Sequence, residues 1–247
     1  MYQRERLARD EQARTQSMAY DALILDNDGV IVTPTPAAVW QSVNWLAFWD
    51  NGAHPGTKHV IGLDRRDPHE IRAIAAEYGI DPETLWRDRE RHAVREQREA
   101  IRAGHKQRYD DVEALPASLD IGIVSNNQHG TVEFIVDFFG LGDRVDSYYG
   151  RDPDLTGFSR RKPDPHYLER AIEDLDASNP LFVGDSNADL GAAAAAGIDA
   201  AFLRRPHREG YTLEYEPTYE VKNLREVTAL CSPRRDRPVS DSPAGVL

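Results

Sequence analysis

Short apolar runs alternate with segments of helical periodicity along most of the chain. The runs are Ala22–Leu25, Ile121–Val124, Leu181–Val183 and Ala200–Leu203, with a weaker one at Ser147–Tyr149. They are almost wholly apolar, as expected for strands covered on both faces. Helical patterns fall between them, at Thr131–Gly140, Pro165–Leu175 and Ala188–Ala196. The alternation predicts an α/β fold with a doubly wound, mostly parallel sheet.

The interval between the first two runs departs from this rhythm. No strand pattern occurs there, and the periodicity is helical over Ala37–Trp49, Pro68–Tyr78 and Pro82–Ala103. Such an interval is far too long for a connection inside a sheet, because most connections span about 4–6 residues. We therefore expect an inserted α-helical domain that the chain enters directly after the first strand.

These patterns divide the chain into four parts. The α/β core is expected to comprise residues 18–33 and 112–230, and the inserted helical cap residues 34–111. Residues 1–17 are polar and charged, which predicts a flexible leader unless translation begins at the methionine that follows them. Residues 231–247 are rich in Pro, Ser and charge, which predicts a disordered tail.

Composition narrows the class of protein further. The 247 residues carry a formal net charge of −12, which argues against non-specific binding to nucleic acid or to anionic membranes. The chain has one cysteine, no signal-like apolar start and no apolar run near the ~20 residues that span a bilayer. We therefore expect a cytoplasmic protein acting on a small molecule, of unspecified oligomeric state.

Lysine is scarce among the basic residues. The only lysines are Lys58, Lys106, Lys162 and Lys222, and the other 26 of the 30 basic residues are arginines. A surface that is acidic and poor in lysine is typical of proteins from a salty cytoplasm. A GC-rich genome would favour the same residues, so the composition leaves both explanations open.

Polar residues follow the apolar runs at the points where a parallel sheet presents its carboxyl edge. They are Asp26, Asp28, Ser125, Asn126, Asp185 and Asp189, together with Lys162 at a helix start. Each one alone is more often a turn or cap residue, but their joint position at one edge matches a ligand site. Clustered carboxylates repel unless a cation offsets them, and hard oxygen ligands suit Mg²⁺. The cluster predicts Mg²⁺ and a phosphoryl group, contacted by Lys162 and Ser125.

Four segments, DNDGV, SN, KPDP and GDSNAD, resemble in this order the motifs of the haloacid dehalogenase-like (HAD) superfamily. The stretch GDSNADLGAAAAAGI is similar to the branch of phosphoglycolate phosphatases and β-phosphoglucomutases, and the helical interval resembles that superfamily's cap. The resemblance implies a Mg²⁺-dependent phosphatase that hydrolyses a small phosphomonoester through a phospho-aspartate. A phosphoglycolate-like acid or a sugar phosphate is the expected substrate.

The same resemblance implies roles for the catalytic residues. Asp26 would be the nucleophile, and Asp28 the general acid for the leaving alcohol and then the base for water. Ser125 and the backbone N–H of Asn126 would hold phosphate oxygens. Lys162 would neutralise both the nucleophile and the phosphoryl group.

The resemblance also implies a metal site. Asp26, the carbonyl group of Asp28, and Asp185 would bind Mg²⁺. Asp189 is the second acid of its motif and would act through water or by orienting Lys162. Negative charge at the start of a helix is also stabilised by the helix dipole, which is the simpler explanation of Asp189 taken alone.

Several positions depart from the branch or refine it. Asp28 argues for phosphate-ester chemistry, because the dehalogenases lack this acid. Asn27 is expected to point away from the site. Ala38 and Ile61 stand near places where β-phosphoglucomutases carry a histidine and a lysine, which counts against mutase activity. In GLDRRDP, Arg65 is the candidate to reach the substrate from the cap, although a solvated arginine is an equally good interpretation.

Two other functions remain open. A phosphomutase of the β-phosphoglucomutase type would use the same nucleophile and return the phosphoryl group to a sugar. A phosphoacceptor signalling or binding module would also gather acids, a hydroxyl and a lysine on a doubly wound sheet. The long helical interval argues against the second alternative, because such a module has no use for a lid.

Overall fold

Six parallel strands form the sheet in the computed structural model, which describes residues 20–63 and 66–231. The strands are β1 (Ala22–Leu25), β2 (Asp120–Gln128), β3 (Ser147–Arg151), β4 (Pro180–Gly184), β5 (Asp199–Leu203) and β6 (Tyr219–Val221). Their order is β3-β2-β1-β4-β5-β6, so the direction of winding reverses between β1 and β4. The predicted doubly wound parallel sheet is confirmed, and β6 adds an edge strand that the apolar pattern did not indicate.

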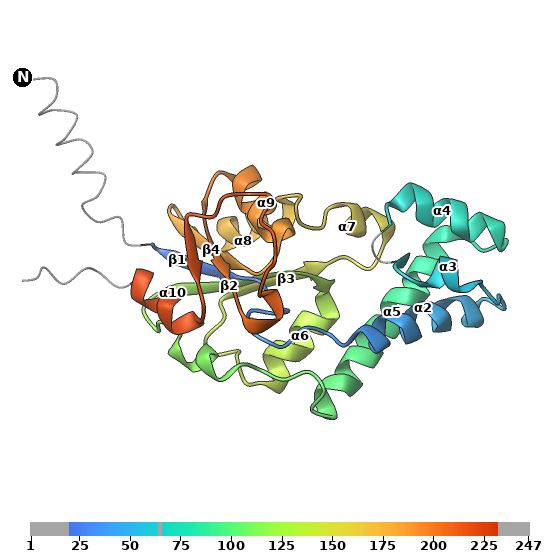
Figure 1. The fold of residues 1–247 in the computed structure, drawn as a ribbon, viewed down its shortest axis with the longest axis horizontal. Coiled ribbons are helices and arrows are strands. Elements are labelled where there is room, and N and C mark those ends of the chain that lie inside the picture. The colour runs from blue at the N-terminus through green and yellow to red at the C-terminus, as the bar shows by residue number, and fades with distance from the viewer. Residues whose placement is uncertain (1–19, 64–65, 232–247) are drawn as a thin grey trace, which may run out of the picture.

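Helices cover both faces of the sheet (Figure 1). On one face lie α6 (His129–Phe138) and α10 (Leu224–Cys231); on the other lie α8 (His166–Asp174) and α9 (Asn187–Ala196). Leu23 and Leu25 of β1 point into the first hydrophobic core, whereas Ala22 and Ile24 point into the second. Because β1 is buried on both sides, every one of its positions is apolar.

Among the described residues, four α-helices lie between β1 and β2 and form a separate group beside the sheet (Figure 1). They are α2 (Ala37–Asp50), α3 (Thr57–Val60), α4 (Pro68–Glu77) and α5 (Pro82–Arg102). Their own hydrophobic core includes the buried rings of Phe48 and Trp86. It also takes in α7 (Leu155–Ser159) from beyond β3, where the ring of Phe158 lies 4.3 Å from that of Trp86. The expected helical insert is therefore present and packs on the α/β core.

Local capping explains where two of the inserted helices begin. The Asp67 side chain accepts the N–H of Glu70 at 2.8 Å, and the Glu70 side chain accepts the N–H of Asp67, which makes a capping box. The Asp81 side chain accepts the N–H of Thr84 at 2.8 Å. A proline takes the first position of each helix, where its missing N–H costs no hydrogen bond.

Some expectations concern residues outside the described ranges. The expected leader at residues 1–17, residues 232–247 of the expected tail and the candidate Arg65 all belong there. Cys231, the first residue of the expected tail, is instead the buried last residue of α10. Within the described ranges, no helix combines the length and the apolar character that crossing a membrane requires. The short elements α3, α7 and α10 were not expected from the sequence.

Removal of a core ring should show how far the sheet depends on packing. Phe202 of β5 is fully buried, so Phe202→Ala should lower the free energy of unfolding by about 3–5 kcal/mol. Phe138 of α6 is 48% exposed, so Phe138→Ala should cost about 1 kcal/mol or less. Urea unfolding followed by circular dichroism measures both. Equal losses in the two variants would contradict the burial described here.

Candidate active site

The predicted site residues within the described ranges meet at the carboxyl edge of the sheet. One cavity of about 280 Å³ is lined by Asp26, Asp28, Ser125, Asn126, Lys162, Asp185 and Asp189. All but Lys162 follow β1 and β4 or belong to the end of β2, next to the point where the strand order reverses, and Lys162 reaches the same place from the segment between α7 and α8. Ligands bind at this place in open α/β sheets.

Lys162 lies at the centre of the negative charge. Its Nζ is 2.7 Å from Oδ1 of Asp26 and 2.6 Å from Oδ1 of Asp189, and it donates to the carbonyl oxygen of Val124 at 2.8 Å. Burial disfavours the ammonium ion, but Asp189 and Asp26 outweigh it and raise the pKa of Lys162. Lys162 is therefore a fixed positive charge that orients two carboxylates.

The surroundings of Asp26 disfavour the ionised form of its carboxyl group. Burial raises the pKa of Asp26 to about 8 although Lys162 opposes the rise, and the charges of Asp189 and Asp185 add to it. A further cation in the cluster would favour the ionised, nucleophilic form of Asp26. The electrostatics of the described residues thus match a site built to hold a metal ion.

Three carboxylates can offer ligands to such an ion. Asp26, Asp185 and Asp189 each present an oxygen, and these oxygens lie within 4.8 Å of one another. Carboxylate oxygens are the donors that Mg²⁺ prefers. Gly29 keeps the space open, because a Cβ on it would lie 2.1 Å from Oδ2 of Asp185, and its φ of 85° also favours glycine. The donor set therefore fits Mg²⁺.

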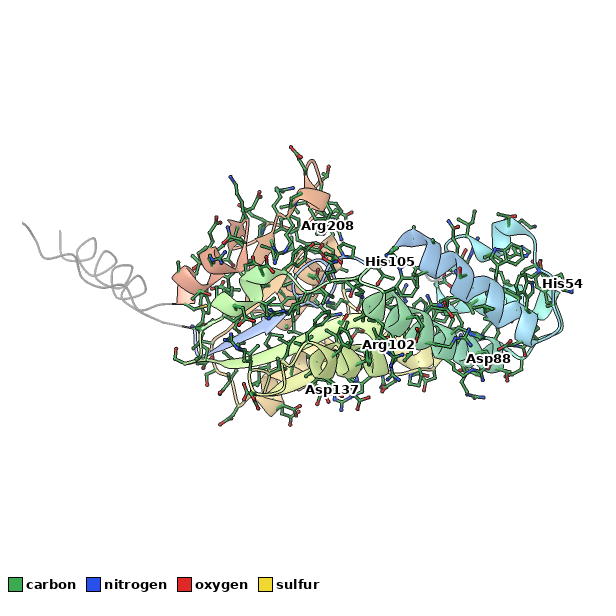
Figure 2. The ribbon with its side chains drawn as sticks, turned by 90° about the horizontal axis from the view of Figure 1, so that it is seen from below. His54, Asp88, Arg102, His105, Asp137 and Arg208 are labelled. Carbon is green, nitrogen blue, oxygen red and sulfur yellow. The ribbon has the colours of Figure 1, made fainter. Side chains whose placement is uncertain are left out.

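Asp185 has two further partners from the segment after β5. Nε2 of His207 lies 2.6 Å from its Oδ2, and Nε of Arg208 donates to the same oxygen at 2.9 Å. Burial opposes ionisation, yet His207 and Arg208 lower the pKa of Asp185. Figure 2 shows Arg208 on the core, on the side toward the inserted helices. A metal ion on Asp185 would share this carboxylate with, or replace, two basic side chains.

Asp189 is fully engaged by protein groups. Its Oδ2 accepts the N–H and the hydroxyl of Ser186 at 2.9 and 2.6 Å, within the capping box that starts α9, and also the N–H of Asp185 at 3.1 Å. Its Oδ1 faces Lys162. Both explanations offered by the sequence, a helix-start acid and a partner of Lys162, thus apply together.

The polar end of β2 is joined to the segment KPDP. Oδ1 of Asn126 accepts the N–H of Lys162 at 2.8 Å, and Nδ2 of Asn126 donates to the carbonyl of Lys162 at 3.0 Å. Ser125 is buried, and its Oγ accepts the N–H of Asn127 at 3.1 Å. This two-bond clamp fixes the lysine backbone beside the strand end that carries the hydroxyl.

Asp28 is surrounded by donors that the sequence analysis did not identify. Its Oδ1 accepts from Nζ of Lys106 at 2.7 Å, Nδ2 of Asn27 at 2.8 Å and Nδ2 of Asn127 at 2.9 Å, and its Oδ2 accepts from the hydroxyl of Thr35 at 2.8 Å. The expectation that Asn27 points away from the site is therefore wrong. Strand alternation does not reach this position, because β1 ends at Leu25 and the chain turns at Gly29.

Lys106 is the main residue that the sequence analysis missed. It is fully buried, and burial lowers its pKa while the charge of Asp28 opposes that change. Of the four lysines, Lys106 and Lys162 are the two buried ones, and each contacts one of the two aspartates that end β1. The scarcity of lysine was the available signal, because a chain that otherwise uses arginine keeps lysine at these two buried positions.

Arginines line the part of the cavity nearest the inserted helices. The residues there are Trp40, Arg89, Arg151, Phe158 and Arg161. Glu90 lies 2.6 Å from Arg89 and 2.7 Å from Arg151, so one carboxylate is shared by two guanidinium groups. Arg151 also donates to the carbonyl of Asn126 at 2.8 Å, which links Glu90 of α5 to the end of β2. This side of the cavity is positively charged.

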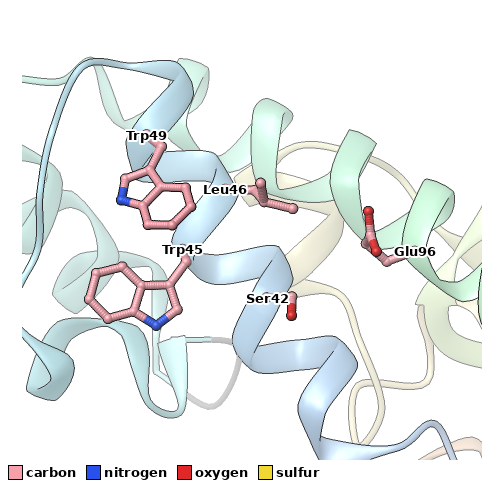
Figure 3. Close-up of a pocket in the computed structure, with 5 residues that line it drawn as sticks. All are labelled: Ser42, Trp45, Leu46, Trp49 and Glu96. Atoms are coloured by element: carbon pink, nitrogen blue, oxygen red, sulfur yellow. The ribbon is translucent and has the colours of Figure 1, made fainter.

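A second cavity, of about 440 Å³, lies on the surface of the inserted helices (Figure 3). Ser42, Trp45, Leu46, Trp49 and Glu96 line it, and they come from α2 and α5. Glu96 is the one titratable group of this set. A cavity of this kind lacks the convergent acids and lysines of the smaller one, so the chemistry belongs to the smaller cavity.

Known proteins share much of this chain. A phosphoglycolate phosphatase of Cereibacter sphaeroides is 27% identical over 205 residues, which cover 81% of this chain and 89% of that protein. A plasmid-encoded phosphoglycolate phosphatase of Cupriavidus necator is 25% identical over 244 residues, which cover 92% and 99%. CbbY from Rhodobacter sphaeroides, crystallised in complex with phosphate, shares the fold with a TM-score of 0.58 at 16% identity, covering 84% and 96%.

A family model gives the assignment. The model of the haloacid dehalogenase-like hydrolases matches residues 20–197. This span runs from the start of β1 through α9 and contains all four acids of the cluster and both buried lysines. The resemblance drawn from the four sequence segments is confirmed, and so is the expectation of an enzyme. The chain belongs to the haloacid dehalogenase-like hydrolases.

Proposed function

We propose that the protein is a Mg²⁺-dependent phosphatase that hydrolyses a small phosphomonoester through a phospho-aspartate on Asp26. The observation that carries the proposal is the pair Asp26 and Asp28 in one cavity, each contacted by its own buried lysine. Membership of a hydrolase family and the phosphoglycolate phosphatases among its relatives support it.

In the first step, Asp26 attacks phosphorus. Lys162 holds Oδ1 of Asp26 at 2.7 Å, so we assign the attack to Oδ2. The bond from Asp26 to phosphorus forms as the bond to the alcohol oxygen breaks, and Asp28 gives its proton to that oxygen. Ser125, the N–H of Asn126 and Lys162 stabilise the oxygens of the transferring group.

In the second step, water replaces Asp26 on phosphorus. The ionised Asp28 takes a proton from the water, the Asp26–phosphorus bond breaks, and inorganic phosphate leaves. Residues 34–111 would act as a cap that excludes water from the first step and admits it for the second.

Asp26, the carbonyl group of Asp28, and Asp185 would hold Mg²⁺. The bound ion would supply positive charge for the phosphoryl oxygens and would favour ionised Asp26. Asp189 would act by orienting Lys162, because its two oxygens already contact Lys162 and the start of α9. A cation must also compete with Arg208 for Asp185, which predicts a modest affinity.

Charge near the inserted helices favours a substrate that carries a second anionic group. Arg89 and Arg151 share the one carboxylate of Glu90, and Arg161 lines the same side of the cavity. A phosphoglycolate-like acid would present a second anionic group to these guanidinium groups, whereas a neutral sugar would not. We therefore place the acid ahead of the sugar phosphate as substrate.

Asp26→Asn should remove the nucleophile without disturbing the fold. Hydrolysis of p-nitrophenyl phosphate with Mg²⁺ should fall by roughly 10³-fold or more. Asp137→Asn, on the exposed side of α6, is the matched control and should retain wild-type activity. Comparable activity in Asp26→Asn and the wild type would refute the nucleophile assignment.

Metal removal should stop turnover reversibly. Treatment with EDTA should abolish phosphate release, and added Mg²⁺ should restore it, because the clustered carboxylates need a cation to bind an anionic substrate. Isothermal titration of the EDTA-treated protein with MgCl₂ should show binding that Asp185→Asn weakens. Full activity in EDTA would remove the metal from the mechanism.

Arg161→Gln should separate acidic from neutral substrates. kcat/KM for 2-phosphoglycolate should fall about 10- to 100-fold, because a hydrogen bond to a charged group contributes about 1.5–3 kcal/mol. kcat/KM for 2-hydroxyethyl phosphate should change about threefold or less. Arg95→Gln, an exposed arginine of α5, is the control. Equal losses for the two esters in Arg161→Gln would contradict the assigned substrate class.

A further inference from the structure

The Nζ of Lys106 has three acceptors and no room for water. It donates to Oδ1 of Asp28 at 2.7 Å, to Oγ1 of Thr35 at 2.8 Å and to Oε1 of Gln97 at 2.9 Å. The residue is 0% exposed, so these contacts account for all three protons of its ammonium group. A lysine held in this way has one fixed orientation, and Asp28 is its only charged acceptor among these three.

Lys106 links both connections between the core and the inserted helices to Asp28. Thr35 precedes α2, Gln97 lies in the last turns of α5, and Lys106 follows α5 on the return to β2. Figure 2 shows His105, the neighbour of Lys106, between the core and the inserted helices. Gln97 also donates to Oδ1 of Asn127 at 3.0 Å, and Asn127 in turn donates to Asp28. The network closes on the carboxylate of Asp28.

The two oxygens of Asp28 are held unequally. Lys106 and two amides all donate to Oδ1, whereas Oδ2 faces the hydroxyl of Thr35. That hydroxyl lies 2.8 Å from Oδ2 of Asp28 and 2.8 Å from Oε1 of Gln97, and it has one proton to give. When Thr35 donates to Gln97, Oδ2 of Asp28 can carry a proton. Oδ1 is the anchored oxygen in either case.

We propose that Lys106 is a positioning residue that fixes Oδ1 of Asp28, so that Oδ2 delivers the proton to the leaving oxygen. The inference rests on the proposed function and names a residue to which that function assigns no role. Lys106 remains a donor throughout and transfers no proton itself. Without it, Oδ1 of Asp28 would keep two neutral amide donors and lose its cationic anchor.

The proposal predicts an effect that depends on the leaving group. kcat/KM reports the steps up to departure of the alcohol, and this departure needs a proton from Asp28 only when the leaving group is basic. In Lys106→Met, kcat/KM for 2-phosphoglycolate, or for the alkyl phosphate that the wild type hydrolyses fastest, should fall about 10- to 100-fold more than for p-nitrophenyl phosphate. A purely structural role would lower both values by the same factor.

Two companion variants make the result decisive. Thr35→Val keeps the shape of a partly buried side chain and should shift the ratio of the two kcat/KM values in the same direction by a smaller factor. Lys222→Met, an exposed lysine, should leave both values unchanged. Thermal unfolding reports whether each variant folds, and Thr35→Val carries the test if Lys106→Met does not.

The possible failures are distinct. An unchanged ratio in Lys106→Met, or in Thr35→Val where the first variant is unfolded, would overturn the positioning role and leave the phosphatase proposal intact. A wild-type protein that hydrolyses neither ester with Mg²⁺ would instead refute the proposed function, and this inference with it.

Discussion

Pairing of two cavity carboxylates with buried lysines is the constraint on which this site depends. Asp26 and Asp28 follow a buried strand, and their side chains are 11% and 24% exposed, so bulk water solvates their charges only in part. Lys162 offsets the charge of Asp26, and Lys106 offsets that of Asp28. Each lysine lies more than 70 positions from its partner along the chain. The sheet edge, the segment KPDP and the return from α5 must therefore all be in place before both aspartates have their partners.

The inserted helices are tied to this site by polar contacts as well as by packing. Glu90 of α5 pairs with Arg151 at the end of β3, and Arg151 holds the backbone of Asn126. Gln97, two turns further along α5, contacts Lys106 and the polar end of β2. One helix thus reaches the strand end proposed to bind phosphate, through Arg151, and also contacts the surroundings of Asp28. Arg89 and Glu90 of this helix are buried and lie 2.6 Å apart, so each offsets the charge of the other.

The sequence predicted those parts of the structure that local patterns determine. The four strong strands followed from unbroken apolar runs, and α2, α4 and α5 begin at the predicted residues, two of them behind an aspartate cap. β6 and α10 are short, and their stability comes from packing on the sheet, which no local pattern reports. Within the candidate site, the sequence identified the residues that belong to the four segments DNDGV, SN, KPDP and GDSNAD. Lys106 was not identified, because its partner Asp28 lies 78 positions away and no local spacing links the two.

The contacts around Asp28 also limit how freely the inserted helices could be exchanged between related enzymes as an independent module. Thr35 and Gln97 belong to the interval that a lid exchange between relatives would replace, yet both are hydrogen-bonded to Lys106. An inserted domain taken from a relative that lacks an amide side chain at the position of Gln97 would leave the buried ammonium group of Lys106 without one of its acceptors. This holds whichever ligand that domain recognised. Recombination at these boundaries would change the fit to substrate and disturb proton transfer in the same exchange. In this chain, Thr35, Gln97 and Asp28 are joined through Lys106 into one hydrogen-bonded unit.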